Sequence, residues 1–258
     1  MILSVLIYIL VTTTVYEVVT FLFAQNGQQH AMLAQLLANI CGLWLLFVFW
    51  RRGMLFLLFD RAQEKEAFVH LDRRRMAGWI VVGICGSVVL NDLLAMPVLR
   101  EAFPSWEQAE NLLYGDHILF LILAACITGP VAEELLYRGI VFSGLRKWMK
   151  LWPAALLSAC VFGLLHLNVL QGIYAGILGI LFALMYEDTG TIWMPVAVHM
   201  LVNCFEVVLQ KTGISAWYGA QNNQMALISG AMAAVCVMLL IWLYRTRTKA
   251  SKADRRFF

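Results

Sequence analysis

The sequence predicts an all-α, polytopic transmembrane helical bundle of about eight spans. Of the 258 residues, 62% are hydrophobic and only 14% are charged, and the mean hydropathy is +0.76. This composition is too apolar for a soluble domain of this size. A helix needs about 20 mostly apolar residues to cross the hydrocarbon core of a bilayer, and eight stretches of roughly this kind follow one another along the chain.

The connections between these stretches are mostly short, so we expect one integral-membrane domain over residues 1–258. The N-terminal stretch lacks the positive start and the small-residue cleavage site of a signal peptide, and we expect it to remain as the first span. The six cysteines all fall in apolar segments without a CxxC pair, which favours small buried side chains over a disulfide framework or a thiolate zinc site. The predicted spans are residues 2–24, 31–50, 76–97, 117–142, 153–168, 171–187, 191–210 and 225–244.

The positive charges predict the orientation of the bundle. Lys and Arg gather in the connection 51–75, in the connection after the fourth span and in the tail 245–258, which all fall on one side of an eight-span topology. On the opposite side the basic residues are Arg100 and Lys211. By the positive-inside rule both termini are cytoplasmic, and residues 245–258 form a basic cytoplasmic tail.

Ionisable side chains inside membrane spans are costly, so each one is a candidate functional residue. Glu17 and Asp92 are best explained by a structural or cavity-lining role, and Glu206 lies near the outer boundary of its span. The remaining ionisable residues in the spans are Glu133, Glu134, Arg138, His166 and His199.

Two of these residues account for each other. Glu134 and Arg138 are four residues apart, so they share one helical face and predict an intrahelical ion pair. Glu133 is rotated by about 100° from Glu134 and needs another partner or another purpose. Gly129-Pro130, just upstream, should kink the helix and release the carbonyl of Cys126.

The other polar residues converge on one layer of the membrane. His199 and Asn203 are four residues apart and form one polar face, and His166 lies over Phe162 in the same way. Counting about 1.5 Å per residue from the cytoplasmic boundaries places Glu133 and His166 roughly 20 Å deep. The same count places His199 and Asn203 at roughly 13 to 20 Å. Spans that run in different directions therefore bring their polar groups to the middle of the bilayer.

This set suits the hydrolysis of an amide. A glutamate and two histidines can hold a water molecule, either by hydrogen bonds or through a divalent metal ion such as Zn²⁺, and the glutamate can take the proton. Asn203 can then donate a hydrogen bond to the developing oxyanion. His166, His199 and Glu133 also form a known type of catalytic zinc set. Helical spacing alone does not separate the metal site from a water held by glutamate and histidine.

The three segments resemble the signature of the CPBP family, the group of CAAX prenyl proteases and bacteriocin-processing proteins that is also called Abi. The family pattern is EExxxR, FxxxH and HxxxN or HxxxD. In this sequence it stands as Glu133-Glu134-Leu-Leu-Tyr-Arg138, Phe162-Gly-Leu-Leu-His166 and His199-Met-Leu-Val-Asn203. The motif-bearing core covers about residues 117–210, four of the eight predicted spans.

The resemblance implies an intramembrane endopeptidase, of either the glutamate-dependent or the metalloprotease kind. On this basis Glu133 is the general base, His166 and His199 fix the water or a metal ion, and Asn203 is the oxyanion partner. Glu134, Arg138 and Phe162 are then supporting residues. The resemblance also implies a multi-pass protein of the cell membrane whose cavity opens to the cytoplasm.

We expect the partners to be the lipid bilayer and a hydrophobic or membrane-associated peptide or protein substrate, and no nucleic acid. Peptide maturation, bacteriocin-type processing or immunity fits this expectation better than cleavage of a prenyl protein. One alternative is a catalytically silent family member that acts as an immunity or regulatory membrane scaffold. Another is a proton-coupled carrier, but the polar set lies in one half of the chain without a matching broken helix in the other.

Overall fold

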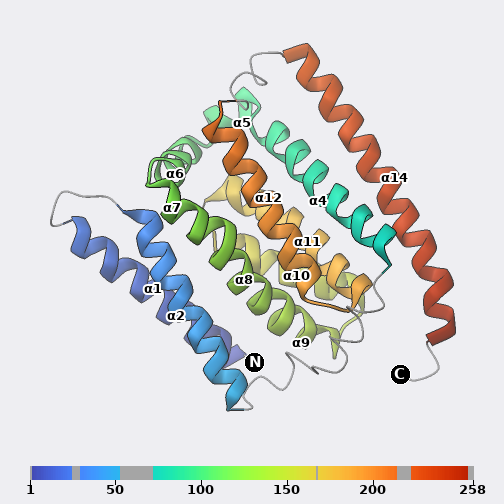
Figure 1. Cartoon of the computed structure of the whole chain (residues 1–258), viewed down its shortest axis with the longest axis horizontal. Helices are drawn as coiled ribbons and strands as arrows, with labels where there is room; N and C mark the ends of the chain where they lie inside the picture. Colours follow the sequence, from blue (N-terminus) through green and yellow to red (C-terminus); the bar gives the residue numbers. More distant parts are fainter. Residues whose placement is uncertain (1, 25–29, 53–71, 167, 214–221, 255–258) are drawn as a thin grey trace.

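In a computed structural model, the described residues of the protein form helices (Figure 1). The structure describes residues 2–24, 30–52, 72–166, 168–213 and 222–254, and these residues contain no strand. The first helices are α1 (Ile2–Ala24), α2 (Ala31–Arg51), α4 (Arg73–Leu94), α5 (Pro97–Ala102) and α6 (Ser105–Tyr114). They are followed by a composite helix and then by α10 (Leu151–Leu164), α11 (Val169–Thr189), α12 (Trp193–Lys211) and α14 (Asn222–Asp254).

The composite helix changes its winding along its length. It runs through α7 (Ile118–Leu121), the π-helical segment η1 (Ile122–Thr128), α8 (Gly129–Glu134), a second π-helical segment η2 (Leu135–Phe142) and α9 (Ser143–Arg146). Together these segments form one apolar helix of 29 residues, Ile118–Arg146, which corresponds to the predicted fourth span. Short π-helical turns inside α-helices are rare and are frequent at functional sites.

Seven of the eight predicted spans are confirmed as helices that are long and apolar enough to cross a membrane, within the described part of the chain. The predicted fifth span, 153–168, is different. Its helix α10 has 14 residues and ends at Leu164, because the chain turns there and Asn168 caps the next helix by accepting a hydrogen bond from the Gln171 amide. At about 1.5 Å per residue, α10 is roughly 21 Å long and shorter than the hydrocarbon core.

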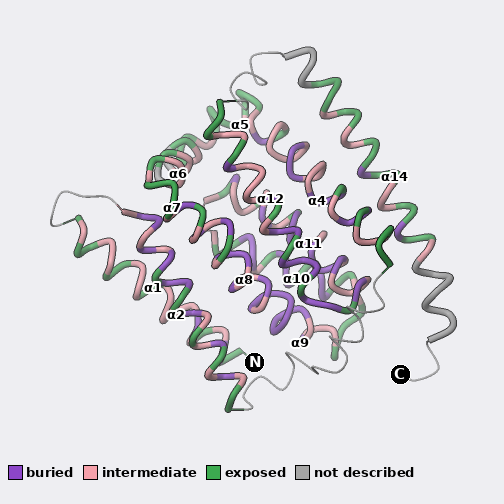
Figure 2. Tube along the Cα trace, viewed as in Figure 1, coloured by how far each residue is buried: buried purple, intermediate pink, exposed green. Residues whose placement is uncertain are grey.

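The helices form a layered bundle around the composite helix. In Figure 1, the hairpin of α1 and α2 lies on one side, α4 and α14 lie on the other, and α12 crosses the middle with α10 and α11 behind it. Within the composite helix, α2 and α12 both contact η1 and α8, whereas α10 contacts η2 and α9. Buried residues gather on these central helices, whereas α1 and α14 are largely exposed along their length (Figure 2).

One end of the bundle carries the predicted basic segments. Arg75 at the start of α4 pairs with Asp188 at the end of α11, and Arg75 also donates to Thr246 of α14. Arg146 at the end of the composite helix pairs with Glu187, with 2.8 Å between Nη2 and Oε1. The connection after the composite helix, the start of α4 and the late part of α14 therefore share one end, as the charge pattern predicts.

The structure describes only part of the basic connection 51–75 and of the basic tail 245–258. Residues 53–71 of the basic connection lie outside the described residues, as do residues 255–258 of the predicted tail. Residues 245–254 continue α14 as helix.

Glycine contacts fix α10 against α11. A Cβ added at Gly163 would lie 2.5 Å from the carbonyl oxygen of Gly172, and one added at Gly172 would lie 2.8 Å from that of Gly163. Small residues allow helix backbones to approach closely in membranes, where packing rather than the hydrophobic effect holds helices together. The contact positions the end of α10, which carries Phe162 and His166, beside α11.

We predict that Gly163→Ala destabilises the protein by about 1 to 3 kcal/mol, because the added methyl group meets backbone atoms that cannot move aside easily. The measurement is thermal unfolding of both proteins in the same detergent. Gly230→Ala in α14 is the matched control, since its Cβ would meet no atom within 4 Å. The control should be neutral or up to about 1 kcal/mol more stable, because alanine favours helix. Equal midpoints for the two variants would contradict the tight contact.

Candidate active site

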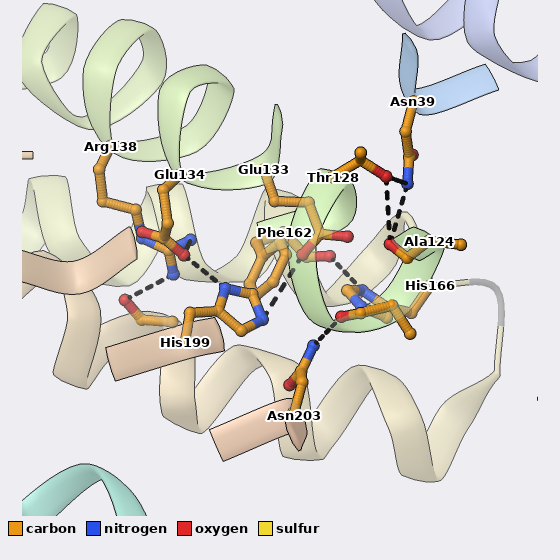
Figure 3. Close-up of polar contacts among 12 residues, drawn as sticks. Asn39, Ala124, Thr128, Glu133, Glu134, Arg138, Phe162, His166, His199 and Asn203 are labelled. Atoms are coloured by element: carbon orange, nitrogen blue, oxygen red, sulfur yellow. Dashed lines mark hydrogen bonds and ion pairs between the residues drawn. The ribbon is translucent and has the colours of Figure 1, made fainter. Parts of the chain in front are cut away.

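The composite helix passes from π-helical to α-helical winding at Gly129-Pro130, where the sequence predicts a kink, and this change of winding is the break in the composite helix. Pro130 lies in the first turn of α8, directly after the π-helical segment η1. In π-helical winding the amide of residue i+5 bonds the carbonyl of residue i, so the missing N–H of Pro130 releases the carbonyl of Ala125 rather than that of Cys126. Asn203 of α12 donates to this Ala125 oxygen from Nδ2 at 2.7 Å (Figure 3).

The predicted ion pair between Glu134 and Arg138 is present and fully enclosed. Arg138 Nη1 lies 2.8 Å from Glu134 Oε1, and the two side chains are 1% and 0% exposed. Nη2 of Arg138 donates to the carbonyl of Gly179 in α11 at 3.1 Å. The guanidinium also lies over the rings of Phe162, at 4.6 Å, and Phe182, at 5.2 Å. The charge of Arg138 is therefore compensated by a carboxylate, a carbonyl and two aromatic faces.

Glu134 has a second partner that the sequence did not predict. Its Oε1 atom lies 2.8 Å from Nδ1 of His199, 65 residues further along the chain. A carboxylate paired with Arg138 accepts hydrogen bonds, so Nδ1 of His199 carries the proton of this contact. Glu134 thus orients the imidazole in addition to supporting the helix, and the Nε2 atom of His199 faces away from it. The spacing of Glu134 and Arg138 gives the carboxylate one partner on its own helix, and it carries no signal for the contact with His199 on α12.

Glu133 meets the other side of the same imidazole. Its Oε2 atom lies 3.7 Å from Nε2 of His199, and its side chain is 33% exposed, whereas His199 is 8% exposed. The rotation of about 100° between adjacent residues therefore places Glu134 in the packed interior and Glu133 at an accessible surface. Figure 3 shows the two carboxylates on the composite helix and the His199 ring between them and α12.

His166 lies at the end of the short helix α10. Its Nδ1 atom is 2.9 Å from the carbonyl oxygen of Phe162, which fixes Nδ1 as the protonated nitrogen and leaves Nε2 for another partner. Its ring meets the Phe162 ring edge to face at 4.8 Å, and the Phe162 ring in turn lies 6.3 Å from that of His199. Phe162 therefore separates and orients the two histidines. Among the described residues, no hydrogen bond or ion pair joins His166 to Glu133 directly.

The proposed metal ligands match a divalent ion in their chemistry but not in their placement. His166 and His199 each have Nδ1 engaged by an oxygen and Nε2 left over, which is how metal-binding histidines are held in proteins. Glu133 supplies the carboxylate. Within the part of the chain that the structure describes, however, no three His, Cys, Asp or Glu side chains lie close enough to hold one metal ion.

The other ionisable residues of the spans lie elsewhere. Glu17 is exposed on α1, and Asp92 of α4 accepts a hydrogen bond from Ser229 of α14. Glu206 of α12 lies beside Ser87 and Asn91 of α4. Glu206 follows Asn203 by three residues on α12, but its named side-chain neighbours belong to α4 rather than to the three motifs.

Comparisons with known proteins agree with this arrangement. Residues 115–205, which carry all three motifs, match the family model described as Type II CAAX prenyl endopeptidase Rce1-like. No solved structure gives a significant match to the chain.

The chain is also similar to named bacterial proteins. It is 26% identical to the "Putative membrane peptidase YdiL" of Bacillus subtilis (strain 168) over 197 residues, which cover 74% of this chain and 81% of that protein. It is 26% identical to the "Membrane-embedded CAAX protease MroQ" of Staphylococcus aureus (strain USA300) over 156 residues, 56% of this chain and 62% of that protein. The motif order, the match to the family model over residues 115–205 and these relatives agree, and together they support the CPBP family of membrane proteases for this chain.

Proposed function

We propose that the protein is an intramembrane endopeptidase that hydrolyses a peptide bond in a hydrophobic or membrane-associated peptide or protein. The observation that carries the proposal is the arrangement of Glu133, His199 and Glu134, in which one imidazole has a buried carboxylate on Nδ1 and an accessible carboxylate near Nε2. The family supports protease activity in general terms, whereas the roles of individual residues are our proposal.

The distance between Glu133 and His199 suits a shared water molecule. At 3.7 Å the two atoms are too far apart for a direct hydrogen bond. A water molecule that bonds to both can bridge polar atoms at such a separation. Glu133 would take a proton from this water as it attacks the carbonyl carbon of the scissile bond, and would pass the proton to the leaving amine.

Glu134 and Arg138 keep the imidazole in a productive state. Because Nδ1 of His199 donates to Glu134, Nε2 is the ring nitrogen that faces Glu133 and the proposed water. Arg138 offsets the charge of the completely buried Glu134 carboxylate. The pair is thus a positioning device for His199 rather than part of the bond-breaking step.

Asn203 would donate to the carbonyl oxygen of the substrate. His166, whose Nδ1 atom donates to the Phe162 carbonyl and whose Nε2 atom is then the acceptor, would help to hold the water. Asn203 uses one amide hydrogen for the Ala125 carbonyl, and its Nδ2 atom carries a second one. Donors aimed at the developing oxyanion typically contribute on the order of 100-fold or more to the rate.

The location follows from the charge pattern. We propose that the protein lies in the cell membrane with the end that carries Arg75 and Arg146 in the cytoplasm. The family resemblance favours a site that opens toward the cytoplasm. A catalytically silent scaffold is the rival function, and it predicts that replacing Glu133 leaves the cellular activity of the protein unchanged.

We predict that Glu133→Gln lowers kcat by about 100-fold to 10,000-fold, because an amide cannot accept the proton from water. The measurement is cleavage of short internally quenched peptides with apolar flanks by the protein in detergent. Glu17→Gln is the matched control, since Glu17 is exposed on α1 and away from the site. Equal cleavage by the wild type and Glu133→Gln would show that another group is the base.

We predict that Glu134→Gln destabilises the protein by about 3 to 5 kcal/mol and also lowers kcat. The substitution leaves the buried charge of Arg138 uncompensated and weakens the contact that orients His199. Glu187→Gln breaks the partly exposed pair with Arg146 and should cost about 1 kcal/mol or less. Thermal unfolding of the two variants tests the difference, and a Glu134→Gln variant as stable as Glu187→Gln would contradict it.

The metal-free and metal-dependent mechanisms make different predictions. If protein groups alone hold the water, the active preparation contains less than one equivalent of divalent metal, and chelators leave kcat unchanged. The measurement is elemental analysis of the detergent-purified protein beside the peptide assay. Loss of cleavage with a chelator and its return on adding Zn²⁺ would instead assign Glu133, His166 and His199 to a metal that draws them together.

A further inference from the structure

An asparagine outside the three motifs contacts the break in the composite helix. Asn39 lies in the middle of α2 and is 6% exposed, in a helix that is otherwise apolar apart from Gln35, one turn earlier, and Arg51 at its end. Its Nδ2 atom lies 3.1 Å from the carbonyl oxygen of Ala124 and 3.1 Å from Oγ1 of Thr128 (Figure 3). Both partners belong to the π-helical segment η1.

A hydrogen bond from Gln35 fixes the orientation of the Asn39 amide. Gln35 donates from Nε2 to Oδ1 of Asn39 at 2.9 Å, so the oxygen of the amide faces Gln35 and the nitrogen faces η1. An amide nitrogen carries two hydrogens, which is the number needed for Ala124 and Thr128. Thr128 in turn donates to the carbonyl of Leu123 at 2.8 Å.

Three successive carbonyls of η1 are therefore bonded by side chains. Leu123 is bonded by Thr128 from the same helix, Ala124 by Asn39 from α2, and Ala125 by Asn203 from α12. Two asparagines on opposite helices thus hold the segment between them. The Ala124 oxygen also accepts the backbone N–H of Gly129, so the Asn39 contact is added to a π-helical hydrogen bond at this position.

The backbone at the start of α8 leaves room for this contact. A Cβ added at Gly129 would lie 2.7 Å from the Ala124 oxygen and 3.5 Å from Nδ2 of Asn39. Gly129 is followed by Pro130, and Glu133 lies one helical turn beyond Gly129. The conformation of residues 122–129 therefore sets the direction in which Glu133 leaves the helix.

We infer that Asn39 is a positioning residue, which together with Thr128 fixes the π-helical turn that aims Glu133 at His199. The inference rests on the proposed role of Glu133 as general base. Asn39 itself touches neither the proposed water nor His199. Its effect passes through the backbone of η1 and α8, so it should alter the rate of the chemical step more than the binding of substrate.

The test uses the full-length protein in detergent with Asn39→Leu, which keeps the size of the side chain and removes the amide. The expected result is a loss of kcat of roughly tenfold or more with KM changed little, because a misplacement of about 1 Å costs on the order of 100-fold in rate. Thr128→Val should show the same split, and the double variant should be little worse than the poorer single variant, since both act on one turn.

Two controls separate positioning from general loss of stability. Asn91→Leu makes the same substitution in α4, beside Glu206, and Thr14→Val removes an exposed hydroxyl that bonds a carbonyl within α1. Both should keep the wild-type kcat per folded molecule. The inference is overturned if Asn39→Leu, measured well below its unfolding temperature, has the same kcat as Asn91→Leu.

A second measurement does not need a substrate. Amide hydrogen exchange in the peptide that covers residues 122–134 should be about tenfold faster in Asn39→Leu than in the wild type, with peptides of α11 unchanged. Unchanged exchange there overturns the inference, whatever the activity. Glu133→Gln in the same assays keeps the two proposals apart. If it cleaves like the wild type, the proposed role of Glu133 as general base fails, whereas an inactive Glu133→Gln with a fully active Asn39→Leu removes the role of Asn39 alone.

Discussion

The completely buried carboxylate of Glu134 joins four helical segments at one point. It bonds Arg138 on its own helix and His199 on α12, while the guanidinium reaches Gly179 on α11 and lies over Phe162 on α10. A buried ion pair contributes little net stability, because the desolvation of both charges offsets their attraction. The pair instead fixes the arrangement of the helices, since its polar and aromatic partners lie on α10, α11 and α12 and all three helices must pack against it to supply them. The helices that carry the histidines are thereby brought to the helix that carries the glutamates.

Two adjacent residues with the same side chain thus have opposite environments. Glu134 is 0% exposed and committed to two partners, whereas Glu133 is 33% exposed and keeps an oxygen near a single imidazole nitrogen. Burial with compensation suits a group that must hold its neighbours still, and accessibility suits a group that exchanges protons with water. The difference arises from the helical rotation of one residue. The cost of charge in the membrane is met for Glu134 by its two partners, Arg138 and His199, whereas our proposal assigns the exposed part of Glu133 to contact with water.

Features with a local cause could be predicted from the sequence. The spans follow from composition, the pair of Glu134 and Arg138 follows from a spacing of four, and the break follows from Gly129-Pro130. Features that depend on distant partners could not. Nothing near Glu134 indicates that it bonds His199, 65 residues away, and the winding of η1 is held by Asn39 and Asn203, 85 and 78 residues from the carbonyls they bond. The early end of α10 was also missed, because apolar residues continue through the turn that follows it.

The two π-helical segments give the helix between them an unusual sensitivity to chain length. A π-helical turn holds one residue more than an α-helical turn, so it resembles an insertion that the helix has absorbed. Deleting a single residue from Ile122–Thr128 would allow regular winding but would turn α8 by about 100° relative to the preceding span. The carboxylate of Glu133 would then face a different neighbour although every residue of the three motifs remained. The number of residues in Ile122–Thr128 therefore determines the direction of Glu133 as much as the identity of the motif residues does.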